Sequence, residues 1–248
     1  MRAALLVLGL ALLGCKPDAK KPPVPPRDGK LGDANRCSGQ PGPKNKKLPV
    51  LQRPFDGQYP VYNLFDHDLP KDVRPNAAGD REQTYCGLEA LGLAEGFPGY
   101  AFALPEGTPV FAAADGEVIF AGAIPPFPCP LTMRRVDDQL SVDVRHDTLG
   151  GIGYITRSVH LGSVTVKTGD KVVAGQRLGV SGKSGCALGP LLYFEVRRLT
   201  GTKSGSPVVV DPYGWDGVGP DPWAEAENGA ESLYLWKDGE APTLKAGG

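Results

Sequence analysis

The chain has 248 residues, 41% hydrophobic and 22% charged, which is enough for one ordinary globular domain with tails. Its formal net charge is -1, so no global charge excess favours nucleic acid or another polyanion as a partner. The 34 glycines and 25 prolines are too many for a typical helical protein and favour short strands joined by tight turns.

The start of the chain has the pattern of an export signal that ends at a lipid-modified cysteine. A short basic start precedes the apolar run Ala3–Leu13, which is too short to span a membrane as a helix. The run ends in Leu12-Leu13-Gly14-Cys15, which resembles the lipobox of bacterial lipoproteins. We therefore predict a signal peptide over residues 1–14 and lipidation of Cys15, with a plain secretory signal as the alternative. By the same resemblance, Lys16 favours the outer membrane, so the expected location is the cell envelope, facing the periplasm or the exterior.

Residues 15–49 are rich in proline, lysine and glycine and contain almost no large apolar side chain. Such a segment cannot bury enough apolar surface to offset its ordering entropy. We therefore expect a disordered tether between the lipid and the folded part of the chain.

Export would place the folded part in an oxidising compartment, where disulfides persist. Besides the lipidated cysteine, four cysteines remain: Cys37, Cys86, Cys129 and Cys186. Four cysteines allow three connectivities. Zinc binding is the alternative, but no C-x-x-C spacing supports it.

Residues 50–96 carry scattered apolar residues and many turn formers, which predicts an irregular lead-in packed on the domain that follows. One short helix is expected over Glu89–Glu95. His67 lies between Asp66 and Asp68, and we interpret this tripeptide as a solvated or locally hydrogen-bonded turn, with metal binding as the alternative.

The pattern changes to β from Gly107 onward. Val110–Ala114 and Glu117–Ala121 flank Asp115-Gly116, a dipeptide suited to the positive φ angles of a two-residue turn, so a hairpin is expected.

Alternation of apolar and polar residues predicts a half-buried strand over Leu140–Arg145, and Tyr154–Leu161 is its expected partner. Further strands are expected over Val172–Val173, Arg177–Val180 and Leu192–Arg197. The predicted fold class is mainly β, with a small antiparallel sheet or barrel-like domain.

Three stretches carry the motif frame of a known peptidase family. They are Phe97-Pro98-Gly99-Tyr100-Ala101, Ser158-Val159-His160-Leu161 and Gly189-Pro190-Leu191-Leu192-Tyr193-Phe194-Glu195-Val196. They resemble the H-x-G-x-D, Y-x-H-L and G-P-H-L-H-F-E-V elements of LytM/lysostaphin-type zinc endopeptidases, which cut the peptide cross-links of bacterial cell walls. The resemblance implies a LytM-type domain with the duplicated hybrid motif over residues 97–212. A C-terminal extension, residues 213–248, would follow.

The resemblance also implies where catalytic groups would stand, and those positions are substituted. Phe97, Ala101 and Tyr193 occupy the three positions of zinc ligands, and Leu191 replaces the histidine that would act as general base. A catalytic zinc needs about three protein ligands and an open position for water. We therefore expect neither metal nor other cofactor, and we interpret His160, which the family uses to stabilise the transition state, as vestigial.

The same resemblance suggests how the cysteines pair. Cys129 and Cys186 fall in loops expected to flank the groove of the family, so these two are expected to pair, which leaves Cys37 with Cys86. In the C-terminal extension, Trp215, Trp223 and Trp236 are expected to be buried, with stacking on sugar rings as the alternative.

The expected function follows from the lipobox and the substituted motifs together. We expect a lipid-anchored envelope protein whose non-catalytic LytM-like domain binds peptidoglycan or regulates a cell-wall hydrolase. One alternative is an active zinc metalloendopeptidase that cleaves peptidoglycan cross-links with relocated ligands, for example His67, His146 and His160. Another is a purely structural lipoprotein. No nucleic-acid partner is expected, and the sequence indicates no oligomeric state.

Overall fold

The computed structural model of the protein describes residues 46–69, 80–87, 89–92, 96–149, 151–199, 201–202 and 204–244. The predicted signal peptide, the predicted lipidation site Cys15 and most of the predicted tether lie outside these residues. The last residues assigned to the tether, Lys47–Pro49, belong to strand β1 (Lys47–Leu51). Regular structure therefore begins a few residues earlier than the composition indicated.

Most of the regular structure is β, as predicted, and the largest sheet contains eight strands of the described chain. In spatial order they are β13 (Lys171–Val172), β7 (Gly116–Ala123), β10 (Leu140–Leu149), β11 (Ile152–Val159), β15 (Leu192–Arg198), β5 (Tyr100–Phe102) and β2 (Val61–Asn63), while β16 (Val208–Val210) pairs with the second half of β15. All of these pairs are antiparallel. The predicted partnership of β10 with β11 is confirmed.

Smaller sheets and one short helix complete the described structure. A three-stranded antiparallel sheet consists of β12 (Leu161–Val164), β14 (Arg177–Ser181) and β6 (Pro109–Phe111). The two-stranded pairs are β1 with β17 (Tyr234–Trp236), β3 (Asp80–Gln83) with β4 (Glu89–Gly92), and β8 (Phe127–Pro128) with β9 (Arg135–Val136). Helix α1 (Pro222–Glu225) starts at Asp221, whose carboxylate accepts the backbone N–H of Trp223. Among the described helices, none has the length and apolar character needed to cross a membrane.

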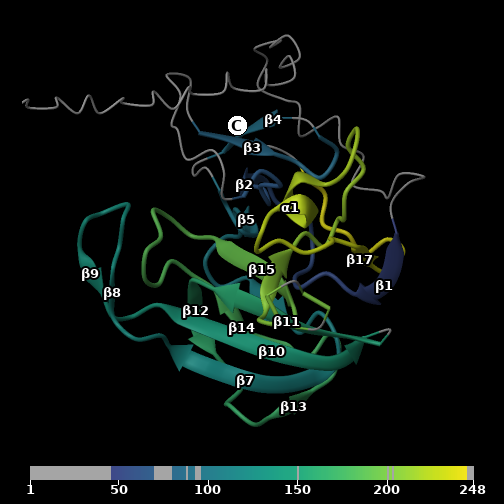
Figure 1. Cartoon of the computed structure of the whole chain (residues 1–248). Helices are drawn as coiled ribbons and strands as arrows, with labels where there is room; N and C mark the ends of the chain where they lie inside the picture. The colour runs from purple at the N-terminus through teal and green to yellow at the C-terminus, as the bar shows by residue number, and fades with distance from the viewer. Residues whose placement is uncertain are drawn as a thin grey trace, which may run out of the picture. The chain divides into compact units, whose positions relative to one another are not determined.

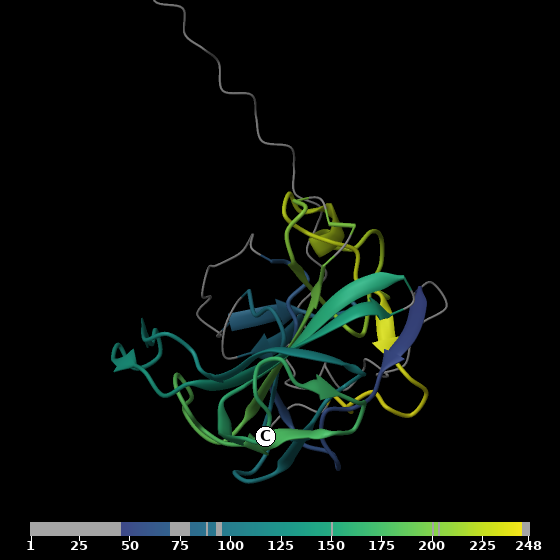
Figure 2. The same ribbon diagram turned by 90° about the horizontal axis from the view of Figure 1, so that it is seen from below.

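Apolar side chains of both larger sheets belong to one hydrophobic core, and the strands of these sheets lie close together (Figures 1 and 2). In β10, Val142 and Val144 point into this core, as the alternation indicated. Ser141 and Asp143 on the opposite face are also buried, so the prediction that only one face is buried is wrong. The core also takes in Leu51 of the lead-in and Trp236 of the extension, both fully buried. Both flanking segments are thus integral to the fold.

The hairpin predicted around Asp115-Gly116 is wrong, because β6 pairs with β14 whereas β7 pairs with β10 and β13. Gly116 does not adopt a positive φ angle. A Cβ at this position would lie 2.4 Å from the backbone oxygen of Arg145, so glycine is required for close strand packing. The segment just before it bonds elsewhere, since the backbone N–H of Ala112 donates to Gln176. This turn therefore carries the chain from one sheet to the other.

The short helix predicted over Glu89–Glu95 is also wrong. Residues 89–92 form β4 and pair antiparallel with β3, while residues 93–95 lie outside the described part of the chain. Helix-forming residues are a weak local preference, and pairing with a neighbouring strand overrides it here.

Candidate functional site

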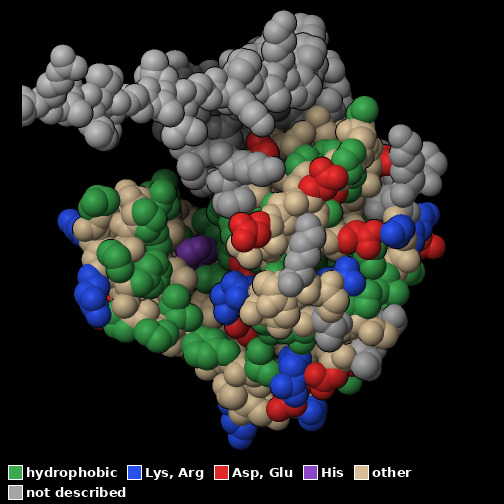
Figure 3. Space-filling model, viewed as in Figure 1, with side chains coloured by type: hydrophobic (Ala, Val, Ile, Leu, Met, Phe, Trp, Pro, Cys, Tyr) green, Lys and Arg blue, Asp and Glu red, His purple; other side chains and the backbone are tan. Residues whose placement is uncertain are grey.

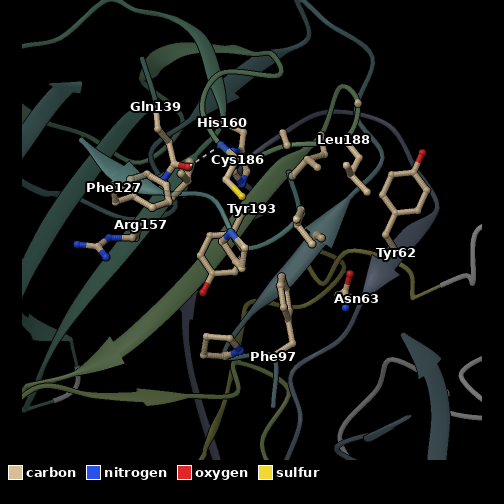
Figure 4. A pocket seen from close by; sticks show the side chains of 18 residues that line it. Tyr62, Asn63, Phe97, Phe127, Gln139, Arg157, His160, Cys186, Leu188 and Tyr193 are labelled. Carbon is tan, nitrogen blue, oxygen red and sulfur yellow. Dashed lines mark hydrogen bonds between the residues drawn. The ribbon is translucent and has the colours of Figure 1, made fainter. Parts of the chain in front are cut away.

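A groove with a volume of about 580 Å³ lies on the eight-stranded sheet. Its floor is a row of side chains from four neighbouring strands, β11, β15, β5 and β2. Backbone pairing places Val159 beside Tyr193, Tyr193 beside Ala101 and Ala101 beside Asn63, and all four residues line the groove (Figure 4).

Two segments form the walls of the groove: the β8–β9 arm, residues 124–139, and the 183–190 loop. The arm contributes Phe127, Pro130, Leu131 and Gln139, and the loop contributes Cys186, Ala187, Leu188 and Gly189. A disulfide between Cys129 and Cys186 joins the arm to the loop, as predicted. Cys86 is also disulfide-bonded, and its expected partner, Cys37, lies outside the described residues.

The structure brings together all five positions that the motif comparison singled out. Phe97, Ala101, His160, Leu191 and Tyr193 all line the groove. The Phe97 ring packs edge-to-face on the Tyr193 ring, with 5.3 Å between their centroids. The substituted positions therefore form one spatial site, on the frame that the motifs predict.

Tyr193 stands at one of the inferred zinc-ligand positions, and its hydroxyl is engaged. It donates a hydrogen bond to Oε2 of Glu195. Burial, helped by the nearby Glu195 carboxylate, raises the pKa of Tyr193 well above its ordinary value. The Tyr193 side chain is thus a neutral phenol, and its hydroxyl proton is already used in a hydrogen bond to Glu195.

His160 links β11 to β12 with φ of 64°, a left-handed conformation that histidine adopts more readily than most residues. Its Nδ1–H donates to the backbone oxygen of Ser184 over 2.8 Å. Burial lowers the pKa of His160, so the ring is neutral at pH 7 with Nε2 as its acceptor. His160 is partly exposed, whereas His67 and His146 are buried. Figure 3 shows a histidine side chain in a hollow bordered by hydrophobic side chains.

These residues do not fit a zinc ion. Phe97 and Ala101 have no donor atom, and the Tyr193 hydroxyl is bonded to Glu195. Only Nε2 of His160 is left, whereas a zinc site needs about three protein ligands. Within the described part of the chain, no group of three or more His, Cys, Asp or Glu is arranged to hold a metal ion.

A second polar cluster was missed by the sequence analysis. His67 is fully buried, with Nδ1 2.8 Å from Asp221 Oδ1 and Nε2 2.9 Å from Asp211 Oδ2. The prediction of a solvated turn is therefore wrong, whereas local hydrogen bonds do form, since Asp66 accepts from the backbone N–H groups of Asp68 and Leu69. Burial disfavours the charged ring, but the hydrogen bonds and charges of the two carboxylates outweigh it and raise the pKa of His67 to about 9. The Tyr100 hydroxyl also donates a hydrogen bond to the Asp211 carboxylate.

The third histidine, His146, is held separately. Its Nδ1–H donates to the backbone oxygen of Asp115, and Nε2 lies 3.0 Å from the Thr156 hydroxyl. Burial lowers the pKa of His146. The three histidines thus have different partners, and the structure does not gather them into a relocated metal site.

Comparison with known proteins identifies the domain that carries the groove. The family model "Peptidase family M23" matches residues 95–208. These residues form an M23 peptidase domain. The range contains the β8–β9 arm, the 183–190 loop and the five groove positions that the motif comparison singled out.

Relatives of the M23 domain include much longer proteins. The chain is 37% identical over 147 residues to the peptidoglycan DD-endopeptidase ShyA of Vibrio cholerae, covering 58% of this chain and 26% of ShyA. It is 34% identical over 94 residues to the cell division protein DipM of Caulobacter vibrioides, covering 38% of this chain and 13% of DipM. The chain thus spans about a quarter or less of these two relatives.

Solved structures similar to this one include two peptidases. A zinc-containing peptidase from Vibrio cholerae is 25% identical, with a TM-score of 0.41 over 66% of this chain and 39% of that one. The catalytic domain of lysostaphin from Staphylococcus simulans is 28% identical, with a TM-score of 0.35 over 47% of this chain and 75% of that one.

Proposed function

We propose that this chain is a bacterial envelope protein whose M23 domain binds a peptide of peptidoglycan in its groove without cutting it. One observation carries the proposal: the inferred ligand positions hold side chains with no free donor atom, yet an open groove of about 580 Å³ remains above them. Binding needs the groove, whereas hydrolysis also needs a means of activating water.

The substitutions make the groove floor less polar. Phe97, Ala101 and Leu191 replace polar positions of the family motif with apolar side chains, and the floor then needs no partners for buried imidazoles or a carboxylate. The two walls and these floor positions together present apolar side chains, which suit a peptide with small apolar side chains.

The relatives supply the ligand class. ShyA is named a peptidoglycan DD-endopeptidase, and the same type of domain here would act on the same polymer. Attachment of lipid to Cys15 would hold the domain near the wall, and the bound state could in turn control a wall hydrolase. Zinc-dependent cleavage with relocated ligands is the competing function.

The mature chain from Cys15 onward tests this proposal when it is dialysed and mixed with purified peptidoglycan sacculi. We expect substoichiometric zinc by elemental analysis, retention of the protein on sacculi, and no release of soluble fragments. Chelator-sensitive release of fragments would establish the competing enzymatic function. Absence of retention would refute binding.

A pair of exposed residues locates the binding surface. Leu188 lines the groove and is 69% exposed, whereas Val218 is 97% exposed and does not line it. Leu188→Glu should weaken retention on sacculi about tenfold, because it places a charge among apolar walls, and Val218→Glu should leave retention unchanged. Equal effects of the two variants would place binding elsewhere on the domain.

A further inference from the structure

A row of charged residues runs beside the apolar floor of the groove. Backbone pairing places Asp143 of β10 beside Arg157 of β11, and Arg157 beside Glu195 of β15. This row lies two residues along each strand from the floor row that contains Val159 and Tyr193. The charged row and the floor therefore share one face of the sheet.

Arg197 follows Glu195 two residues along β15 on the same face, and the charges of these four residues are not equally accessible. The side chains of Asp143 and Glu195 are 8% and 4% exposed, whereas those of Arg157 and Arg197 are 33% and 32% exposed. The formal charges cancel, but the carboxylates lie beneath and the guanidinium groups reach solvent. We call Arg157 and Arg197 the arginine shelf.

Both arginines are held in place from below. Arg157 donates from Nε and Nη2 to the two carboxylate oxygens of Asp143 over 2.9 and 2.6 Å, and Arg197 donates from Nε to Oε1 of Glu195. Each guanidinium has five N–H groups. No partner for the remaining N–H groups of either arginine lies in the part of the chain that the structure describes. Since their orientation is already set, little conformational entropy would be lost on binding an anion.

The shelf is continuous with the groove. Arg157 itself lines the groove, and Glu195 accepts hydrogen bonds from both Tyr193 of the floor and Arg197 of the shelf. In Figure 4 the Arg157 guanidinium and the Tyr193 hydroxyl lie on the same side, away from Leu188 and Tyr62. A ligand in the groove could therefore extend a polar end over the shelf.

We propose that the arginine shelf binds a carboxylate of the same peptide whose apolar part lies in the groove. This proposal rests on the proposed function. Planar guanidinium groups match carboxylates, and charge-assisted hydrogen bonds are stronger than neutral ones. Stem peptides of peptidoglycan combine alanine side chains with free carboxyl groups, which are the two chemistries that the groove and the shelf offer.

The test compares two forms of one ligand on the mature wild-type chain by isothermal titration calorimetry. The probes are a disaccharide tetrapeptide muropeptide and the same muropeptide with its carboxyl groups amidated. We expect the free acid to bind about tenfold more tightly, because amidation removes the charge-assisted hydrogen bonds. The difference should shrink as salt is raised.

Variants then assign the difference to the shelf. The pair Asp143→Asn with Arg157→Gln removes both charges together, so that no buried carboxylate is left without a partner. This pair should reduce the preference for the free acid over the amidated form, because only Arg197 of the shelf then remains. Arg145→Gln is the matched control: Arg145 is 39% exposed, bonds Glu117 and does not line the groove, so its variant should keep the preference.

Each result decides a separate point. Equal binding of the two forms by wild-type protein would overturn the shelf as a carboxylate site and leave groove binding intact. Preference for the free acid that is undiminished in the paired variant, or that is lost in Arg145→Gln, would also overturn it. Failure of both forms to bind would overturn the shelf proposal and the wall-peptide function together.

Discussion

At the scale of single residues, the buried Asp211–His67–Asp221 cluster makes stability depend on pH. The pKa of His67 is raised from 6.5 to about 9, so the bound proton contributes stability that is complete below pH 6.5 and is lost as pH rises through about 9. This shift corresponds to about 3 kcal/mol. We expect the difference in unfolding free energy between wild type and His67→Gln to shrink by about that amount from about pH 6 to about pH 10.

A histidine that is already neutral provides the control for this pH dependence. Burial lowers the pKa of His146, so His146→Gln should change the unfolding free energy by an amount that stays constant from about pH 7 to about pH 10. Urea denaturation at several pH values measures both differences. A constant difference for His67→Gln as well would show that folding does not raise the pKa of its ring.

Reversing the substitutions tests whether the frame for a metal survives. Ala101 lies directly opposite Tyr193 in paired strands, and Phe97 packs on Tyr193. We expect the triple variant Phe97→His, Ala101→Asp and Tyr193→His to bind about one zinc per chain by elemental analysis, because three ligands would converge. The variant without Ala101→Asp should bind zinc more weakly. A folded triple variant with no zinc would show that the backbone frame has also changed.

The sequence predicted which residues lie together where motifs kept their spacing. It did not predict contacts between residues that are far apart in the chain. Phe97, Ala101, Leu191 and Tyr193 converge as the motifs predict. His67, by contrast, bonds two carboxylates, Asp211 and Asp221, that lie 144 and 154 residues further along the chain. The residues next to His67 in the sequence do not indicate these partners. The sequence of a short polar tripeptide does not distinguish an exposed turn from a segment that is buried in the core.

At the scale of elements, the β8–β9 arm depends on one covalent link. The Cys129–Cys186 disulfide closes a loop of sequence separation 57 and ties the arm to the 183–190 loop. Replacing both cysteines with serine should lower the unfolding free energy by roughly 2–4 kcal/mol and weaken ligand binding, since one groove wall loses its attachment. Urea denaturation and limited proteolysis within residues 124–139 would measure the change. Met133→Ala is the control: this position of the arm is 86% exposed, so the variant should change neither the unfolding free energy nor ligand binding.

Local pattern predicted the strands better than their pairing. Leu140–Arg145 alternates along its own length, and the predicted strand is confirmed as part of β10, but Ser141 and Asp143 are buried as well as Val142 and Val144. Asp115-Gly116 gave a local hairpin signal, but whether two strands pair depends on the other strands available to them. β7 lies between β10 and β13, so both of its edges are already occupied.

At the scale of the whole molecule, the M23 domain shares its core with its flanking segments. Leu51 and Trp236 are fully buried in the same core, and their strands β1 and β17 pair in parallel. His67 of the lead-in is bonded to Asp221 of the extension. Cutting the chain at the motif boundaries, residues 97–212, would expose these apolar surfaces and separate a buried charged pair.

We therefore expect a fragment of residues 97–212 to lack a cooperative unfolding transition, although it contains every motif of the groove. A fragment of residues 46–244 should unfold cooperatively, because it retains both flanks of the core. Within the longer fragment, Trp236→Ala should cost about 3–5 kcal/mol, the usual range for a large buried aromatic side chain. Thermal and urea unfolding, followed by circular dichroism, distinguish these cases. Cooperative unfolding of residues 97–212 at the same midpoint as residues 46–244 would show that the flanks only cover a domain that is already complete.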